Sequence, residues 1–460
     1  MRTALCLALS LLGCRRASPQ PAPRDAAAVA PRDVITPRDV ITPRDVTAPR
    51  DVGASVDVVA RARTTRVATR TTGDDVLDAM VPLSDGALHV RAINRDGQRV
   101  SEIVATSLDA DGRPRGPARV LRRTTGPVRR LDASAAGGAL WVAWGAVRPG
   151  AADAQGTQRA EFLVVAMRAS TDLATVERPV TVENFRAVYV DEPDMAPQAL
   201  SVPEVGVVAA DDGSARVIAS APPQTCVHEA GTDHATREPC KGWSVTAITP
   251  EGARDRSVEG TLAMARGPYG LLRLPNGYVF AVEDDHIGSK ISVIPTAFSN
   301  GLTVAVEGDT FWHYREVAFA ASGGAVFIRG MPTEEGMRAS PEGHLRALDP
   351  AHAASTPTRQ GEWGDEWPAI TARALRCERG RPVIALRWDG GRATLDPAAP
   401  GSAFRWEEWL SPEELPGLSA DGRAAQVPPL AWTGRVLVGV TGGETLRWRC
   451  GARGSLERAP

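Results

Sequence analysis

A turn containing glycine precedes a short, apolar, β-prone run seven times in this chain of 460 residues. One example is Gly138, which is followed by the run from Leu140 to Trp144. Most of these runs follow an alternating apolar stretch, and several precede a third one, so each unit is expected to form a small antiparallel meander. The glycines are Gly86, Gly138, Gly206, Gly277, Gly324, Gly380 and Gly434, spaced 47 to 71 residues apart. This pattern predicts an all-β protein.

A single meander cannot bury both faces of its sheet, so such units need neighbours, and a ring leaves no unmatched terminal unit. The spacing suits the four-stranded blade of a β-propeller. We therefore predict a β-propeller of about seven four-stranded blades over residues 64–460. Only ten residues follow Cys450, so the last unit lacks an outer strand, which we expect Thr65–Thr71 to supply. A two-sheet sandwich or two tandem β-domains are the alternatives.

The first sixteen residues carry an export signal. Arg2 precedes an apolar run from Ala4 to Leu12 that is too short to span a bilayer. The sequence from Leu11 to Cys14 then resembles the lipobox of bacterial lipoproteins. The resemblance implies that residues 1–13 are a signal peptide and that Cys14 becomes the lipidated N-terminus. A plain secretory signal or a chance apolar start is the alternative.

The lipoprotein resemblance also implies a location in the cell envelope, with a lipid anchor holding the chain at a membrane. Arg15 follows the lipidated cysteine, whereas many lipoproteins retained at the inner membrane carry Asp there. This difference favours the outer membrane.

Residues 14–63 form a proline-rich repeat in which Pro-Arg-Asp-Val recurs every six residues from Pro31. Proline at this density prevents helix and central strand, and each unit balances one Arg with one Asp. The segment holds 9 Arg and 6 Asp, with no Lys or Glu. We expect a disordered tether, reaching more than ~100 Å if it is extended as polyproline. A recognition role for the repeated unit is the alternative.

The charge balance argues against a nucleic-acid partner. The whole chain carries a net charge of −2, and the tether is its basic part, so the remainder is more acidic. Duplex binding requires a concentrated basic surface, which the sequence does not show. The expected partners are a membrane, reached through the lipid anchor, and an envelope protein, peptide or glycan.

Four cysteines remain beyond the lipobox. Cys226 and Cys240 enclose thirteen residues of the longest repeat, and Cys377 and Cys450 would tie the sixth repeat to the seventh. In an exported protein we expect two disulfides with these pairings. The alternative is a metal site in which His228 and His234 join the first two thiols, although the spacing matches no familiar zinc motif. We expect neither a metal nor a cofactor.

Candidate binding residues are few. Glu283, Asp284, Asp285 and His286 follow a predicted strand and place three carboxylates and an imidazole at one loop. Acidic strand ends are also common on ordinary β-proteins. Trp363, Trp367, Trp406 and Trp409 could line a groove, but tryptophans between blades more often pack in the core.

No familiar catalytic signature appears, whether a nucleophile elbow, a metalloprotease helix or a nucleotide-binding loop. We therefore expect a non-catalytic binding or scaffolding module of the cell envelope, with no catalytic residue assigned. The alternative is an envelope hydrolase or lyase whose polar residues converge from distant loops at one mouth of the ring.

Overall fold

The computed structural model divides the chain into two units, Met1–Ala60 and Arg61–Pro460. Only the second unit contains residues that the structure describes. They are 69–71, 74–95, 100–152, 158–189, 204–220, 241–261, 265–266, 271–274, 277–284, 288–295, 304–305, 314–322, 325–332, 342–348, 368–397, 404–418, 426–441 and 443–460. The predicted signal peptide, Cys14 and the tether therefore lie outside the described residues.

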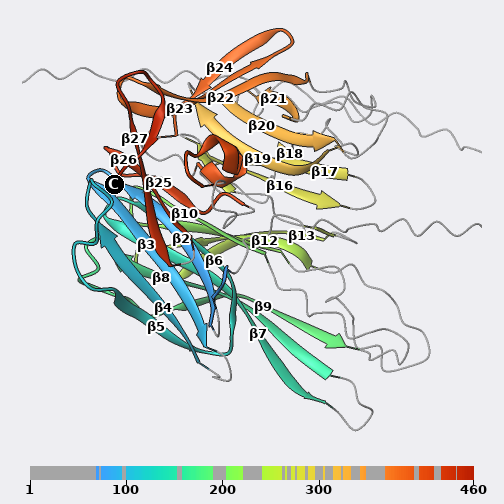
Figure 1. Cartoon of the computed structure of the whole chain (residues 1–460). Coiled ribbons are helices and arrows are strands. Elements are labelled where there is room, and N and C mark those ends of the chain that lie inside the picture. Colours follow the sequence, from blue (N-terminus) through green and yellow to red (C-terminus); the bar gives the residue numbers. More distant parts are fainter. Residues whose placement is uncertain are drawn as a thin grey trace, which may run out of the picture. The chain divides into compact units, whose positions relative to one another are not determined.

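Seven antiparallel sheets account for the described strands, and we number the sheets in chain order (Figure 1). The first contains β1 (Thr69–Thr71), β2 (Asp74–Leu83), β3 (Gly86–Arg95), β4 (Val100–Leu108) and β5 (Arg119–Thr125), and the second contains β6 (Val128–Ala136), β7 (Ala139–Ala152), β8 (Gln158–Ser170) and β9 (Val180–Tyr189). The third contains β10 (Glu204–Ala209), β11 (Ala215–Ser220), β12 (Lys241–Ile248) and β13 (Arg254–Thr261), and the fourth contains β14 (Ala265–Arg266), β15 (Leu271–Leu274), β16 (Gly277–Asp284), β17 (Gly288–Pro295) and β18 (Val304–Ala305). The fifth contains β19 (Tyr314–Ser322), β20 (Ala325–Pro332) and β21 (His344–Leu348), and the sixth contains β22 (Ile370–Glu378), β23 (Arg381–Trp388) and β24 (Gly391–Leu395). The seventh contains β25 (Leu430–Trp432), β26 (Val436–Thr441), β27 (Glu444–Cys450) and β28 (Leu456–Arg458), and two short 3-10 turns, η2 (Trp406–Glu408) and η3 (Pro412–Glu414), precede it.

Among the described repeated glycines, all except Gly206 lie at hairpin turns or begin the strand after one, as the sequence predicts, and Gly324 lies outside the described residues. Gly138, Gly380 and Gly434 have φ of 77°, 78° and 96°, a region that residues with a Cβ seldom adopt. Gly206, in contrast, lies inside β10, paired with Ile218. The hairpin of the third sheet turns instead at residues 211–214, where the glycine is Gly213 with φ of 84°.

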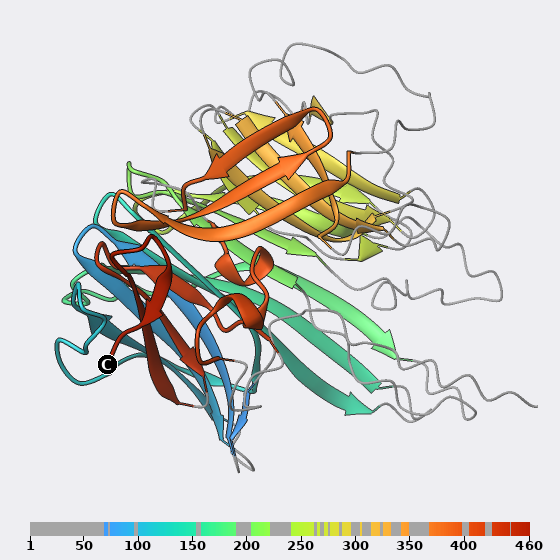
Figure 2. The same ribbon diagram turned by 45° about the horizontal axis from the view of Figure 1, so that its top comes forward.

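Successive sheets bury apolar side chains between them. One core joins the first and second sheets, another joins the second and third, and a third joins the fifth, sixth and seventh. Strand β15 of the fourth sheet contacts both β10 and β19. Strand β25 contacts β2, and the red strands β25 and β26 run beside the blue strands β2 and β3 in both views (Figures 1 and 2). The last sheet therefore packs against the first, with Ala87, Leu108, Ala431 and Val438 buried between them.

The edges of the first and last sheets differ from the prediction. Residues Thr69–Thr71 pair with β2 of the first sheet and do not complete the last one. The outer strand of the seventh sheet is β28, formed by Leu456–Arg458 of the last ten residues. Leu456 is buried, and Cys377 donates a backbone hydrogen bond to Gly454 O at 2.9 Å. The C-terminal residues can therefore form this strand because their own apolar side chain and the neighbouring sheet stabilise it.

The predicted disulfide between Cys377 and Cys450 is confirmed, with a Cα to Cα distance of 5.6 Å. It joins β22 of the sixth sheet to β27 of the seventh. Cys226 and Cys240 lie outside the described residues.

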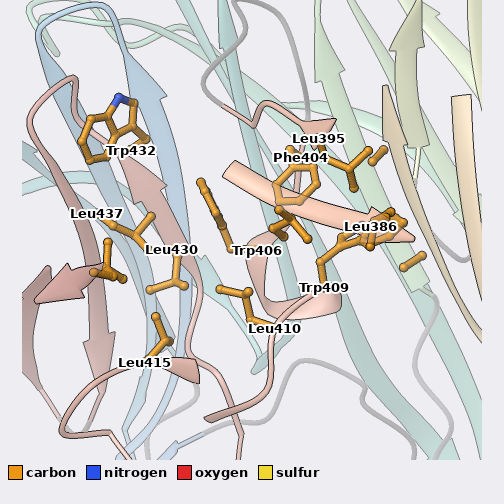
Figure 3. Packing of buried hydrophobic residues seen from close by; sticks show 14 of the residues in the cluster. Leu386, Leu395, Phe404, Trp406, Trp409, Leu410, Leu415, Leu430, Trp432 and Leu437 are labelled. Atoms are coloured by element: carbon orange, nitrogen blue, oxygen red, sulfur yellow. The ribbon is translucent and has the colours of Figure 1, made fainter. Parts of the chain in front are cut away.

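Aromatic residues before the seventh sheet fill its core (Figure 3). Trp406 and Trp409 are 2% and 0% exposed, which confirms core packing for these two, while Trp363 and Trp367 lie outside the described residues. Phe404 packs edge-on against Trp406, with ring centroids 5.2 Å apart. Trp406 lies between leucines of the sixth and seventh sheets, labelled in the figure as Leu386, Leu395, Leu430 and Leu437. Among the described residues, no helix is long and apolar enough to cross a membrane.

Candidate functional site

A cavity of about 760 Å³ lies between strands of the first three sheets and the segment that leads into the seventh. Strands β2, β6 and β10 line it, together with the hairpin turns that follow them. Residues around η2 and β25 also line the cavity. The cavity-lining residues used below are Asp78, Asp85, Asp132, Asp211, Arg381, Phe404, Arg405, Glu407 and Trp432. Sequence reasoning placed none of them in a site.

Asp132 on β6 is a buried carboxylate with three donors. Its Oδ2 accepts hydrogen bonds from the Arg405 guanidinium at 2.7 Å and from the backbone N–H of Val207 at 2.8 Å. Its Oδ1 accepts the backbone N–H of Ala133 at 2.7 Å. The Asp132 side chain is 6% exposed and that of Arg405 is 21% exposed. These bonds hold together β6, β10 and the segment before the seventh sheet, so Asp132 acts as an anchor for Arg405.

Asp78 on β2 has a different environment. The imidazole Nε2 of His89 donates to Asp78 Oδ1 at 2.7 Å, and Arg91 Nε lies 3.4 Å from the same oxygen. The Asp78 side chain is 10% exposed. Both contacts fall on Oδ1, so among the described residues Oδ2 has no hydrogen-bond partner. Asp78 therefore lines the cavity with a carboxylate that is held on one oxygen and has no described hydrogen-bond partner on the other.

The cavity is acidic and partly aromatic. Among the described lining residues, five are acidic (Asp78, Asp85, Asp132, Asp211 and Glu407) and two are arginines (Arg381 and Arg405). Arg405 is already paired with Asp132, and its Nη1 lies 3.7 Å from Glu408. The rings of Phe404 and Trp432 supply apolar surface, each less than a tenth exposed. A neutral or cationic polar ligand suits this lining better than an anion does.

Asp85 lies in the turn after β2, at the hairpin end of the cavity. Arg115 donates to its carboxylate at 2.7 Å. This hydrogen bond and the charge of Arg115 lower the pKa of the Asp85 carboxyl below its usual value of 3.8. Asp85 therefore stays ionised at the hairpin end in mildly acidic solution.

Strand alternation explains why Asp78 and Asp132 lie outside the apolar core. The sequence Leu-Asp-Ala occurs at Leu77–Ala79 on β2 and at Leu131–Ala133 on β6. In both copies the leucine and alanine pack in the core shared by the first two sheets. Successive strand residues point to opposite faces, so the two aspartates point away from that core. An aspartate between two apolar residues in the first long strand of each sheet was the available signal for both.

The loop candidates from the sequence lie largely outside the described residues. Glu283 and Asp284 end strand β16, where they pair with Ser289 and Gly288 of β17. Their side chains, and the whole of Asp285 and His286, lie outside what the structure describes. A binding site at these four residues therefore stays a prediction.

No protein-family model matches this chain, and no curated protein matches it. Solved structures do show similarity at low identity. A GH43_1 enzyme from Xanthomonas citri is 11% identical, over 55% of this chain and 81% of that one, with a TM-score of 0.29. The Trypanosoma rangeli sialidase in complex with the inhibitor DANA is 11% identical, over 82% of this chain and 68% of that one, with a TM-score of 0.34. The polysaccharide lyase Uly1 is 8% identical, with a TM-score of 0.34, and the match spans 55% of its length.

The three structures named here are enzymes by their printed names, whereas the sequence led us to expect a non-catalytic binding module, so that expectation is corrected. The expectation went wrong because the charged residues that line the cavity are far apart in sequence and form no linear signature. TM-scores below 0.5 assign no chemistry, and the choice of reaction depends on this chain's own residues.

Proposed function

We propose that this chain is a cell-envelope hydrolase that cleaves a neutral or cationic glycoside in the cavity. Asp78 is the carboxylate that acts as its general base. The proposal rests on the hydrogen bonding of the Asp78 carboxylate. Its Oδ1 is held by His89 at 2.7 Å, and it lines the cavity with Oδ2 unpartnered among the described residues. A carboxylate oriented in this way can take a proton from an attacking water molecule.

Glycoside hydrolysis needs a second acidic group, which protonates the leaving oxygen. Glu407 and Asp211 line the same cavity and are the candidates for that role. Asp132 is a poor candidate, because three donors already occupy it. Trp432 and Phe404 also line the cavity, and the exposed edges of these largely buried rings offer a small apolar contact to a sugar.

Charge favours hydrolysis over elimination. A lyase that acts on an acidic sugar needs cations to neutralise the substrate carboxylate. Here acidic residues outnumber arginines along the described lining, and Arg405 is paired with Asp132. An anionic substrate would therefore meet net repulsion, whereas an uncharged or amino-bearing sugar would not.

The proposal extends to architecture and location. The sheets contact one another in a closed order, from the first to the seventh and back, and we take them as seven propeller blades around the cavity. We further propose that Cys14 carries the lipid anchor and that the proline-rich segment holds the domain away from the outer membrane. Its partner there is an envelope glycan.

The test uses the full chain, purified in detergent, with nitrophenyl glycosides of neutral, amino and uronic sugars. Turnover is expected for neutral or amino sugars. Asp78→Asn should lower kcat by at least about 100-fold, the usual contribution of a general base. Asp111→Asn is the matched control, because Asp111 is an exposed aspartate that does not line the cavity.

Two results would overturn the proposal. One is wild-type turnover by Asp78→Asn. The other is cleavage of an added galacturonate oligomer alone, with a 4,5-unsaturated uronate at the new chain end, which would establish the lyase because elimination expels the sugar on O4. The anchor is tested separately, because a Cys14→Ala chain should leave the detergent phase in which the wild type partitions.

A further inference from the structure

On the described strands β2 and β6, the cavity lining begins at the hairpin turn and stops part-way along the strand. On β2 it runs from Asp85 in the turn back to Asp78, although the strand continues to Asp74. On β6 it runs back to Asp132, although the strand continues to Val128. Five residue steps separate Asp78 from the end of β2 at Leu83, which at the rise of a strand gives a depth of about 17 Å.

The ion pair of Asp132 and Arg405 stands at the inner limit of this lining. Arg405 enters from the segment before the seventh sheet and reaches β6, with 273 residues between the two partners in sequence. The neighbouring Trp406 is packed in the core, so the backbone that presents Arg405 is fixed. The backbone N–H of Val207 on β10 donates to the same carboxylate, so a third strand lines the cavity at this depth.

We propose that the Asp132–Arg405 pair forms the floor of a blind pocket and that the enzyme therefore acts on the terminal residue of a glycan chain. The inference rests on the proposed function for the reaction and adds the class of substrate. The ligand enters end-on from the hairpin turns. Asp78, at the same depth as the floor, meets the terminal residue and not an internal one.

The floor also determines which charge the bound sugar can carry. Arg405 does not serve an anionic end group, because Asp132 and Glu408 already face it. Asp78 and Asp132 both lie at the inner end. The terminal residue that this pocket accepts is therefore uncharged or carries an amino group.

The experiment measures binding, so it does not depend on turnover. Linear oligomers of glucose, N-acetylglucosamine, glucosamine and galacturonate, from monomer to hexamer, are titrated calorimetrically into the full chain in detergent. For a blind pocket, Kd should improve over the first residues and then stay constant from trimer to hexamer. Galacturonate oligomers should bind at least about tenfold more weakly than the best neutral or amino series, a difference of about 1.4 kcal/mol.

A variant tests the floor directly. In Asp132→Ala/Arg405→Ala both side chains are truncated and lose their charge together, so the floor is opened and neither charge is left buried and unpaired. With the floor opened, Kd should continue to improve beyond the trimer. Arg435→Gln is the control, because Arg435 is exposed and lies outside the cavity lining.

The outcomes separate the two proposals. Kd that improves about tenfold from trimer to hexamer in the wild type overturns the blind pocket, as does preferred binding of galacturonate. A plateau in Kd without any hydrolysis supports the pocket and refutes the enzyme. No saturable binding of any series refutes both. If the double variant does not fold, the wild-type length series still decides the inference.

Discussion

Asp132→Ala should be among the most destabilising single substitutions in the described part of this chain. The change removes the acceptor of three hydrogen bonds. A hydrogen bond to a charged group contributes about 1.5–3 kcal/mol, and an orphaned buried donor such as the Val207 N–H costs about 1–3 kcal/mol. Breaking a buried ion pair from one side typically costs ~3–5 kcal/mol, and we expect a loss of stability in that range.

The opposite substitution should cost less. In Arg405→Ala the Asp132 carboxylate keeps its bonds to the backbone N–H groups of Val207 and Ala133. We expect a loss of about 1–3 kcal/mol. The double variant should cost little more than Asp132→Ala alone, which corresponds to a coupling energy of about 1–3 kcal/mol between the two sites.

The assay is denaturant unfolding of the full chain, followed by tryptophan fluorescence, since Trp406 is buried beside Arg405. Asp111→Ala is the control. Asp111 and Arg435 are an exposed pair 3.7 Å apart, with an expected effect of at most about 1 kcal/mol. Equal costs for Asp132→Ala and Asp111→Ala, or strict additivity in the double variant, would refute the reasoning.

Three further predictions concern the turns and the disulfide. Replacing both Cys377 and Cys450 by serine should destabilise the chain by about 4 kcal/mol, the loop entropy for a separation of 73 residues, and an unchanged denaturation midpoint would contradict this. Gly137→Ala should cost at least about 2 kcal/mol, because φ is 55° and the new Cβ would lie 2.1 Å from a carbonyl oxygen of the next sheet's turn, and a melting curve like that of the wild type would count against it. The lowered pKa of Asp85 contributes stability above its unfolded value of 3.8, and this contribution is lost as pH falls through the folded value. In Arg115→Gln the midpoint of the Asp85 carboxyl in an NMR titration should rise, and an unmoved midpoint would exclude Arg115 as the cause.

The sequence predicted the sheets better than it predicted their edges. Gly138 and Gly380 mark hairpins because the positive φ of each turn favours glycine. This requirement is local, so the sequence alone reveals it. Gly206 was misassigned because a glycine followed by valines is equally compatible with the interior of a strand. The outer strand Leu456–Arg458 was missed because its pairing depends on the neighbouring sheet and not on its own composition.

The candidate site was beyond the sequence for a related reason. Asp132 and Arg405 are joined across 273 residues, and no local pattern reports such a pairing. The acidic loop around Glu283 drew attention because its charges are adjacent in the chain. Asp78 and Asp132 are each flanked by apolar residues, as in Leu77–Ala79, and the charges of the cavity come together only when different sheets pack together.

By itself the sequence determined the all-β class, the hairpin repeat and the pairing of Cys377 with Cys450. Turn conformation and side-chain alternation depend on a few neighbouring residues. The disulfide follows from the number of cysteines and their positions in the repeats. Tertiary structure alone decided which sheet β1 and β28 join, and which carboxylates share a cavity. Those outcomes depend on how whole sheets bury their faces against one another, and burial is a property of packing that no short segment contains.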